Sequence, residues 1–284
     1  MQAEGDADVG KRAAAAAAVA LVKDGMALGL GTGSTVRFLI ELLEARIQAE
    51  RLRVIGVATS VETEARARAA GIALGELAPG CQLDLAIDGA DEVEQGTLAL
   101  IKGLGGALLR EKIVASSARD FVVIADASKL VARLGTLAPV PVEIARFAHA
   151  ATARRLERSA RIALESNGDA IPGDNGERIT PLETTEESVF SHAANASGAR
   201  AVLRLAAGGE PFVTDNGNFI YDLHGLAPIA DPRALERDLV LIPGVVESGL
   251  FTLPVRCAFI GSVDGTVRAL KPRGKDRPIG VAAG

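Results

Sequence analysis

Apolar and polar positions divide the first half of the chain into short apolar runs separated by segments with helical spacing. The apolar runs predict strands over Met26–Leu30, Arg53–Ala58, Ile72–Leu74, Asp84–Ile87 and Phe121–Ala125. The segments between them predict helices over Lys11–Lys23, Thr35–Arg46, Val61–Ala70 and Ala107–Ala115. Strands that alternate with helices favour a parallel, doubly wound sheet. The first half of the chain is therefore expected to form a Rossmann-like α/β domain.

The pattern changes after Gly135. The elements expected there are a strand over Leu137–Ile144, a helix over Ala150–Ala163, strands over Ala201–Leu205 and Pro211–His224, a helix over Pro232–Leu241 and a strand over Val245–Leu253. This order is typical of a ferredoxin-like α+β module. A last hairpin, Cys257–Ile260 with Thr266–Leu270, would return the chain to the first domain. We therefore expect a Rossmann-like catalytic domain at residues 1–136 plus about 255–284, and a smaller α+β domain at about 137–254 with a loop excursion near 161–198.

Composition narrows the classes of function. The 284 residues carry a net charge of −5 with both signs interspersed, which gives no basic footprint for nucleic acid. No apolar run reaches the ~20 residues of a membrane span, and the N-terminus lacks the order of a secretory signal. Two cysteines, Cys81 and Cys257, and three scattered histidines form neither a disulfide framework nor a zinc pattern. We therefore expect a cytoplasmic protein without a metal site.

A glycine-rich turn lies between the apolar run Leu98–Ile101 and the helix expected at Ala107–Ala115. Lys102 opens this turn, and Glu111 lies one turn into the helix. A strand, a glycine turn and a helix start make an anion site, because glycine lets the backbone approach a ligand and the helix start has unpaired N–H groups. The alternative is that the charged residues of this helix form a solvated face.

A second glycine turn, Gly29–Val36, precedes another expected helix. Ser34 and Thr35 stand where an N-cap is expected, and hydroxyls with helix-start N–H groups suit a phosphate. The turn reads G-x-G-x-G, which differs from the dinucleotide fingerprint, and the next strand ends in Thr59 and Ser60 without an acid for a ribose. A small phosphorylated ligand fits better than a dinucleotide. The alternative is a capped helix whose glycines only make a tight turn.

Two further strand ends carry polar residues. The run Asp84–Ile87 leads into Asp88–Glu92, and Phe121–Ala125 leads into Asp126–Lys129. The carboxyl ends of parallel strands share one edge of the sheet, where ligands bind. Three close carboxylates in the first segment repel one another, which raises a pKa or requires a cation nearby. The alternative for that segment is an ordinary polar turn.

Six motifs follow one another along the chain, and together they carry a family resemblance. They are GTGSTV, DGADE, KGLGGALLREKI, ADASK, VTDNGN and IPGVVESGLF. From about Lys11 to Val267 the chain resembles the ribose-5-phosphate isomerase A family. The resemblance implies a Rossmann-like domain with a smaller α+β domain inserted late, and a homodimer or homotetramer. It also implies reversible conversion of D-ribose 5-phosphate to D-ribulose 5-phosphate, in the non-oxidative pentose phosphate pathway, without a metal or organic cofactor.

The resemblance also implies which residues form the site. Glu111 matches the family's proton acceptor. The matching substrate-binding residues are Thr32, Gly33, Ser34, Thr35, Asp88, Gly89, Ala90, Asp91, Lys102, Gly103, Leu104 and Gly105, with Lys129 as a further contact and Lys11 near the phosphate. Leu104 stands where the family has glycine, so it needs a negative φ and a side chain that points away from the sugar. The segment from about 161 to 197 is longer than the family needs.

The expected chemistry explains these residue types. An aldose–ketose conversion moves a proton between adjacent carbons through an enediolate, and Glu111 would take it from C2 and return it to C1. Burial would raise the pKa of Glu111 from ~4.3 towards the working pH, where a base is most effective. Lys102 and the N–H groups of the turn would stabilise the enediolate, and either Asp88 or Asp91 would move the hydroxyl proton. Two rival functions are a sugar-phosphate sensor without turnover and an acyl-CoA transferase relative in which Glu111 attacks a thioester.

Overall fold

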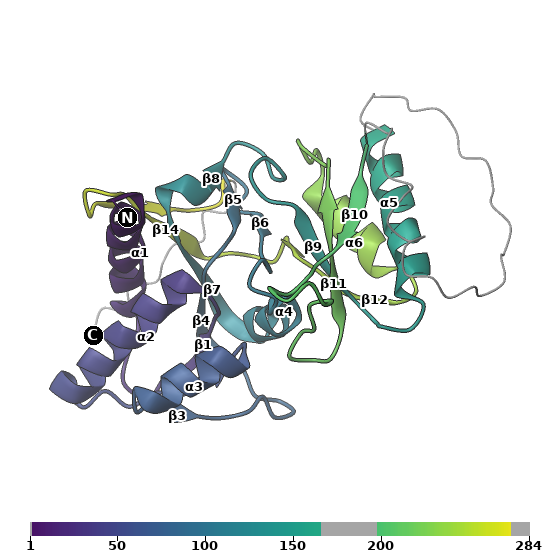
Figure 1. Cartoon of the computed structure of the whole chain (residues 1–284). Coiled ribbons are helices and arrows are strands. Elements are labelled where there is room, and N and C mark those ends of the chain that lie inside the picture. Colours follow the sequence, from purple (N-terminus) through teal and green to yellow (C-terminus); the bar gives the residue numbers. More distant parts are fainter. Residues whose placement is uncertain (1, 166–197, 274–284) are drawn as a thin grey trace, which may run out of the picture.

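The computed structural model describes residues 2–165 and 198–273 (Figure 1), and its largest element is a seven-stranded sheet. The strands are β1 Ala27–Leu30, β2 Ile55–Ala58, β3 Ala73–Leu74, β4 Leu83–Asp88, β7 Ala118–Asp126, β14 Cys257–Gly261 and β15 Val267–Leu270. Their order is β15-β14-β7-β4-β1-β2-β3, and all neighbours are parallel except β15 on β14. The predicted Rossmann-like parallel sheet is confirmed.

Helices cover both faces of this sheet. They are α1 Gln2–Val19, α2 Ser34–Glu50, α3 Val61–Ala69 and α4 Leu108–Ser116. Leu85 and Ile87 of β4 join the core under α1, α2 and α3, whereas Ala86 between them joins the core under α4. A Cβ on Gly29 would lie 2.5 Å from a methyl carbon of Val114 on α4. Glycine in β1 therefore lets α4 pack close to the sheet, next to the carboxyl ends of the strands.

The second sheet belongs to the smaller α+β unit. Its elements are β9 Val140–Ile144, α5 His149–Glu165, β10 Arg200–Leu203, β11 Phe219–His224, α6 Pro232–Val240 and β12 Val245–Ser248. The sheet is antiparallel with the order β10-β11-β9-β12, and α5 and α6 share its core. This order of a β-α-β-β-α-β chain is the ferredoxin-like arrangement that was predicted.

A third, small sheet was not predicted. It consists of β5 Glu92–Glu94, β6 Leu100–Ile101, β8 Leu130–Val131 and β13 Leu250–Phe251, in the order β13-β6-β5-β8. Its strands β5 and β6 lie between the large sheet and the α5–α6 unit (Figure 1). The apolar run before Lys102 therefore belongs to this sheet, and the single strand predicted at Val245–Leu253 is divided between two sheets. Short, non-local pairing of this kind leaves no periodicity in the sequence.

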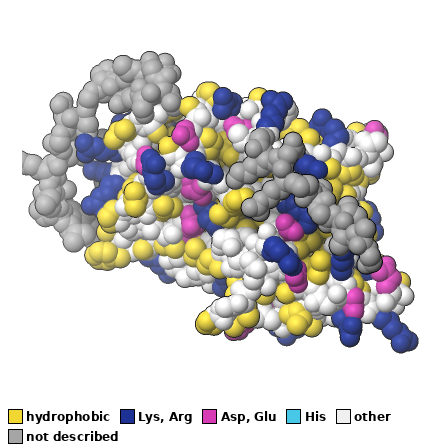
Figure 2. Space-filling model, turned by 180° about the vertical axis from the view of Figure 1, so that it is seen from behind, with side chains coloured by type: hydrophobic (Ala, Val, Ile, Leu, Met, Phe, Trp, Pro, Cys, Tyr) yellow, Lys and Arg dark blue, Asp and Glu magenta, His cyan; other side chains and the backbone are white. Residues whose placement is uncertain are grey.

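The chain returns to the large sheet through β14, which pairs in parallel with β7, and the predicted final hairpin is confirmed. This return supports the division at about residues 136 and 255, which stays a prediction. The excursion expected near 161–198 begins inside a helix, because α5 runs to Glu165, and its remainder lies outside the described residues. Within the described part of the chain, no helix combines the length and apolarity needed to cross a bilayer. Basic and acidic side chains are interspersed on the face shown in Figure 2.

Candidate active site

Three charged side chains meet in the interior at the carboxyl end of β4. The ammonium nitrogen Nζ of Lys102 lies 3.0 Å from Oδ2 of Asp88 and 3.3 Å from Oε2 of Glu111, and it donates to the carbonyl of Gly89 at 2.7 Å. Their exposed fractions are 3% for Asp88, 2% for Lys102 and 4% for Glu111. Removing charges from water costs several kcal/mol per ion, which pairing offsets only in part. A cluster that opposes folding in this way points to a function.

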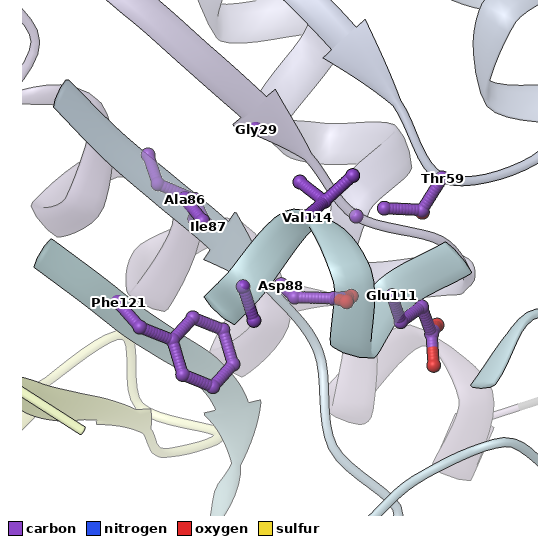
Figure 3. A pocket seen from close by; sticks show the side chains of 10 residues that line it. Gly29, Thr59, Ala86, Ile87, Asp88, Glu111, Val114 and Phe121 are labelled. Atoms are coloured by element: carbon purple, nitrogen blue, oxygen red, sulfur yellow. The ribbon is translucent and has the colours of Figure 1, made fainter. Parts of the chain in front are cut away.

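Three different elements deliver these side chains. Asp88 is the last residue of β4, Lys102 follows β6 directly, and Glu111 lies in the first turn of α4. Asp88 and Glu111 lie next to each other at the meeting point of β4 and α4 (Figure 3). A Cβ on Gly31 would lie 2.0 Å from Oδ1 of Asp88, so only glycine leaves room for this carboxylate. The same Oδ1 accepts the N–H groups of Thr32 at 3.1 Å and Gly89 at 2.7 Å, which fixes its orientation.

The electrostatics of the cluster raise the pKa of Glu111 to about 8. Burial is the main cause and the charge of Asp88 adds to it, while Lys102 opposes both. Burial also raises the pKa of Asp88 against the opposing charge of Lys102. Burial alone would lower the pKa of Lys102, but the carboxylates of Asp88 and Glu111 outweigh it and raise it. One permanent cation thus faces two carboxyl groups, which favours the protonated form of Glu111 near neutral pH.

Glu111 has the freest oxygen in the cluster. Its Oε2 is buried and has no hydrogen-bond partner among the described residues, although it lies within ion-pair distance of Lys102. A narrow crevice, which has no room for a water molecule, runs past Asp88 and Glu111 to Thr59 (Figure 3). A carboxylate oxygen that accepts no hydrogen bond, in a group whose pKa is raised, is suited to accepting a proton.

In the turn after Lys102, glycine occupies the two positions where the backbone has a positive φ. Gly103 has a φ of 103° and Gly106 a φ of 82°, in the left-handed region that favours glycine. Leu104 does not have a positive φ, and its side chain is 43% exposed. The expected backbone conformation of Leu104 is therefore confirmed, and the direction of its side chain relative to the sugar stays a prediction. The N–H of Leu104 donates to Oδ2 of Asp91 at 2.9 Å, so Asp91 also reaches the site.

The predicted cluster of three carboxylates is only partly right. Asp88 and Asp91 reach the site, whereas Glu92 enters β5 and accepts the N–H groups of Gly135, Leu137 and Ala138. Side chains alternate along a strand, and this alternation sends Glu92 to the opposite side. Glu92 therefore holds a loop of the chain and takes no part in the site. Within residues 2–165 and 198–273, no group of three or more His, Cys, Asp or Glu side chains is arranged to hold a metal ion.

The first glycine turn leads into α2 differently from the prediction. Gly33, with a φ of 108°, occupies the N-cap, no side chain caps the helix, and Ser34 is its first residue. The expectation that Ser34 or Thr35 caps the helix was wrong, because the positive φ of Gly33 turns the chain into the helix one residue earlier. Ser34 is exposed at an uncapped helix start. Oγ1 of Thr32 lies 2.7 Å from Oγ1 of Thr59, which joins this turn to the end of β2.

Two predicted lysines lie at the periphery. Lys11 on α1 pairs with Asp8 at 3.5 Å, and Arg37 in the early part of α2 pairs with the same Asp8 at 3.3 Å, so Lys11 lies near the start of α2. Lys129 ends a short 3₁₀ helix, Ala127–Lys129, that directly follows β7. No ion pair of Lys129 occurs among the described residues. No described contact joins Lys11, Lys129, Ser34, Thr35 or Ala90 to the charge cluster, so their roles stay predictions.

The motif VTDNGN has a role that the sequence did not show. The buried Oε1 of Glu143 accepts hydrogen bonds from Thr214 at 2.9 Å, Asn216 at 3.1 Å and Asn218 at 2.9 Å, which shapes the turn. The turn then contacts both helices that flank the site. Arg110 on α4 donates to Oδ1 of Asn216 at 2.9 Å, and the N–H of Val61 at the start of α3 donates to Oδ2 of Asp215 at 2.9 Å. The only sequence signal for this role was the high density of Asn, Asp and Thr, whose side chains can hydrogen-bond in a turn and to neighbouring elements.

Phe251 was also missed, although it lies in the motif IPGVVESGLF. Its ring centroid is 5.5 Å from Nζ of Lys102 and 4.8 Å from Nζ of Lys112. Lys112, the residue after Glu111, binds Glu236 of α6 at 2.6 Å and Glu247 of β12 at 2.8 Å. These contacts tie α4 to the smaller unit and hold the helix that carries Glu111.

The chain matches known proteins along most of its length. The family model described as ribose 5-phosphate isomerase A (phosphoriboisomerase A) matches residues 55–188 and 179–265. The ribose-5-phosphate isomerase A of Gloeobacter violaceus is 45% identical over 267 residues, which are 94% of this chain and 98% of that protein.

Solved structures agree with this match. The ribose 5-phosphate isomerase of Plasmodium falciparum superimposes with a TM-score of 0.78 at 33% identity, over 94% of this chain and 99% of that one. A D-ribose-5-phosphate isomerase in complex with phospho-erythronic acid superimposes with a TM-score of 0.75 at 32% identity, over 93% and 99% of the two chains. This chain is therefore an isomerase that belongs to the ribose 5-phosphate isomerase A family.

Proposed function

We propose that this chain interconverts D-ribose 5-phosphate and D-ribulose 5-phosphate, with Glu111 as the proton acceptor. The observation that carries the proposal is the buried Glu111, whose Oε2 has no hydrogen-bond partner in the described chain and whose pKa is raised to about 8. A base is most effective when its pKa lies near the working pH. The relatives named for this reaction support the choice of substrate.

The reaction moves two protons and needs no other reactant. The carboxylate of Glu111 removes the proton on C2 of the open-chain aldose, and the C–H electrons form the C1–C2 double bond of an enediolate with its negative charge on O1. The protonated Glu111 then delivers the proton to C1. O2 loses its proton as the C2 carbonyl forms, and O1 gains one. One base on one face of the sugar can therefore serve both carbons.

Stabilisation of the enediolate is the role that we assign to Lys102 and the glycine turn. The two carboxylates that raise the pKa of Lys102 keep its ammonium charged at every working pH. The N–H of Gly105 has no partner among the described residues, so it stays available as a donor. Preorganised donors of this kind are worth about 10²–10³ in rate.

Asp91 is the better candidate for the hydroxyl proton. Both oxygens of Asp88 are engaged, Oδ1 by two backbone N–H groups and Oδ2 by Lys102. Asp91 accepts only the N–H of Leu104, through Oδ2, among the described residues. An oxygen that is not committed to the fold can exchange protons with O1 and O2 of the sugar and can assist ring opening.

The start of α2 is the proposed phosphate site. The helix runs over 17 residues from an uncapped start, where its N–H groups are unpaired. Ser34 adds an exposed hydroxyl. Lys11 lies near the start of α2, because it pairs with Asp8, which also pairs with Arg37 of that helix. Lys129, at the end of the 3₁₀ helix that follows β7, completes the proposed set. Binding the phosphate remotely from the reacting carbons supplies orientation at Glu111.

We further infer a homodimer or homotetramer in the cytoplasm. Strand β10 forms one edge of the antiparallel sheet, and Val202 on it is 46% exposed. An exposed apolar edge strand favours pairing with another chain. The two cysteines, Cys81 and Cys257, are both free thiols, as a reducing compartment requires.

Turnover of D-ribose 5-phosphate in EDTA, with Glu111→Gln beside the native chain, tests the proposal. Gln keeps the shape of the side chain but cannot accept the proton, so kcat should fall about 10³-fold while phospho-erythronate still binds. Glu62→Gln is the matched control, because Glu62 lies in the first turn of α3 with its side chain 70% exposed. Near-native kcat in Glu111→Gln would contradict the role of Glu111. Binding without turnover in the native chain would favour a sensor, and CoA-dependent activity with a covalent adduct on Glu111 would favour a transferase.

A further inference from the structure

Arg204, on the smaller unit, reaches the glycine turn of the site. It follows β10 directly, and its side chain is 13% exposed. Asp222 of β11 holds the guanidinium on two sides, with Nε donating to Oδ2 at 2.9 Å and Nη2 donating to Oδ1. The remaining nitrogen, Nη1, donates to the carbonyl of Gly103 at 2.8 Å and to that of Leu104 at 3.1 Å. Arg204 is therefore fixed in place and aimed at two consecutive peptide groups.

Those two peptide groups have their N–H ends on the side away from Arg204. In a trans peptide the carbonyl and the N–H point in opposite directions. In the first peptide group, the carbonyl of Gly103 accepts from Arg204, and the N–H of Leu104 donates to Oδ2 of Asp91. In the second, the carbonyl of Leu104 accepts from Arg204, and the N–H of Gly105 has no partner in the described chain. A Cβ on Gly105 would meet only Thr32, at 3.8 Å, so Gly105 lies beside the other glycine turn, on the site's side.

The smaller unit holds the turn at a second point. A Cβ on Gly106 would lie 2.5 Å from Cζ of Phe212, so the aromatic ring packs directly on this glycine. Phe212 is tied to Arg204, because its N–H donates to the carbonyl of Arg204 at 2.8 Å. The turn is thus held from one side by Arg204 and Phe212, and the N–H groups of Leu104 and Gly105 lie on the other.

We propose that Arg204 is a positioning residue for the isomerisation, and that it acts through the peptide groups of Gly103–Gly105. It holds both carbonyls, so the N–H of Gly105 is directed at the enediolate without reorganisation. Its positive charge polarises both peptides, which makes their N–H groups stronger donors. The inference rests on the proposed function, since a turn that binds no developing negative charge needs no such support.

The test compares Arg204→Met, Arg204→Lys and Asp222→Asn with the native chain. Met keeps the length of the side chain but removes every donor, and we expect kcat to fall about 10- to 100-fold while KM for D-ribose 5-phosphate changes less than threefold. Affinity for phospho-erythronate, whose carboxylate resembles the enediolate, should fall by the same factor as kcat. Competitive inhibition by inorganic phosphate should not change. Arg204→Lys should recover part of the loss, and Asp222→Asn, which leaves Arg204 able to bind the turn, should lose least.

Arg256→Met is the matched control, because Arg256 pairs with Asp120 at 2.7 Å and has no described contact with the turn. Native kcat in Arg204→Met, with only a lower Tm, would overturn the proposal. Equal losses of phosphate and phospho-erythronate affinity would also overturn it, since they indicate collapse of the whole site. If Arg204→Met does not fold, the role of Arg204 is tested by the phospho-erythronate affinities of the native chain, Asp222→Asn and Arg204→Lys, which should decrease in that order. If the native chain binds phospho-erythronate without turnover, the proposed function fails. The ratio of phospho-erythronate affinities of the native chain and Arg204→Met then still tests whether Arg204 positions the turn.

Discussion

Two hollows in this molecule can be compared directly. The crevice beside Asp88 and Glu111 has no room for a water molecule, whereas the cavity between α5 and α6 has a volume of about 250 Å³. The larger one is lined mainly by apolar side chains, and its two acids are already engaged. Asp231 caps α6 by accepting the N–H groups of the next turn, and Asp238 pairs with Arg237. Volume therefore does not mark the site of chemistry here, and unbalanced buried charge does.

The two regions also differ in what they contribute to folding. The core under α5 and α6 is apolar and gains stability in proportion to the surface it removes from water. The site buries two carboxyl groups against one ammonium and bends its backbone through glycines of positive φ. Active sites commonly trade stability for function in this way. Changes at the site should therefore move activity strongly, and changes in the larger cavity should not.

Gly103→Ala should have the largest effect on the site. Gly103 has a φ of 103°, and a Cβ there would lie 2.7 Å from Cβ of Leu108, the first residue of α4. Both the strain and the clash shift the turn relative to α4, and a displacement of ~1 Å can cost 10²-fold in rate. We expect kcat to fall about 100-fold and the free energy of unfolding to fall by about 2 kcal/mol. Steady-state kinetics and urea unfolding measure the two effects.

Gly105→Ala is the matched control for folding. Its φ is not positive, and its Cβ would meet only Thr32, at 3.8 Å. The free energy of unfolding should therefore change by less than about 0.5 kcal/mol. Equal destabilisation by the two substitutions would show that the turn is not strained at Gly103, and the contrast between site and cavity would lose its structural basis.

The pH dependence of kcat/KM should show an effect of about tenfold. Glu111 acts as a base only when deprotonated, and with a pKa of about 8 its deprotonated fraction rises ~10-fold between pH 7 and pH 9. kcat/KM should rise accordingly, because it reports the free enzyme. A profile that is flat from pH 7 to pH 9 would contradict a raised pKa of the base. The turnover of Glu62→Gln should follow the native profile.

The same pKa predicts a stability effect of defined sign. Folding raises the pKa of Glu111 from 4.5 to about 8, so the folded state binds the proton more tightly. This contribution to stability is fully present below pH 4.5 and is lost as the pH rises to about 8. Glu111→Gln carries no titrating group, so its free energy of unfolding should exceed that of the native chain by a margin that grows with pH, roughly 4 kcal/mol by pH 8. Urea unfolding at pH 5 and pH 8 measures the margin.

The large sheet and the ferredoxin-like unit could be predicted because their elements are periodic. Apolar runs such as Phe121–Ala125 end in polar residues, and the order of strands and helices limits the topology. The small third sheet could not be predicted, since a strand such as Leu100–Ile101 is too short to show alternation. For the same reason the sequence did not separate Glu92 from the neighbouring acids Asp88 and Asp91, because the direction of its side chain depends on strand β5, which was not predicted.

The charge cluster was predicted in its members but not in its geometry. Glycine turns and strand ends identified Asp88, Lys102 and Glu111, since each stands next to a local signal. Contacts across ~100 residues leave no such signal, and Arg204 reaches the turn at Gly103 over that separation. Side chains that act from a distant element are visible only once the chain is folded.

Ala234→Leu should have the smallest effect of all. Ala234 lines the cavity between α5 and α6 and is half-buried on α6, so a leucine would fill apolar space and change stability by no more than about 1 kcal/mol. Ala234→Ser, which leaves the cavity unfilled, is the control. kcat and KM should stay within twofold of native in both variants. The test is demanding, because Glu236 of the same helix binds Lys112 beside Glu111 at 2.6 Å. A loss of kcat beyond tenfold would show that the cavity is coupled to the site through this ion pair.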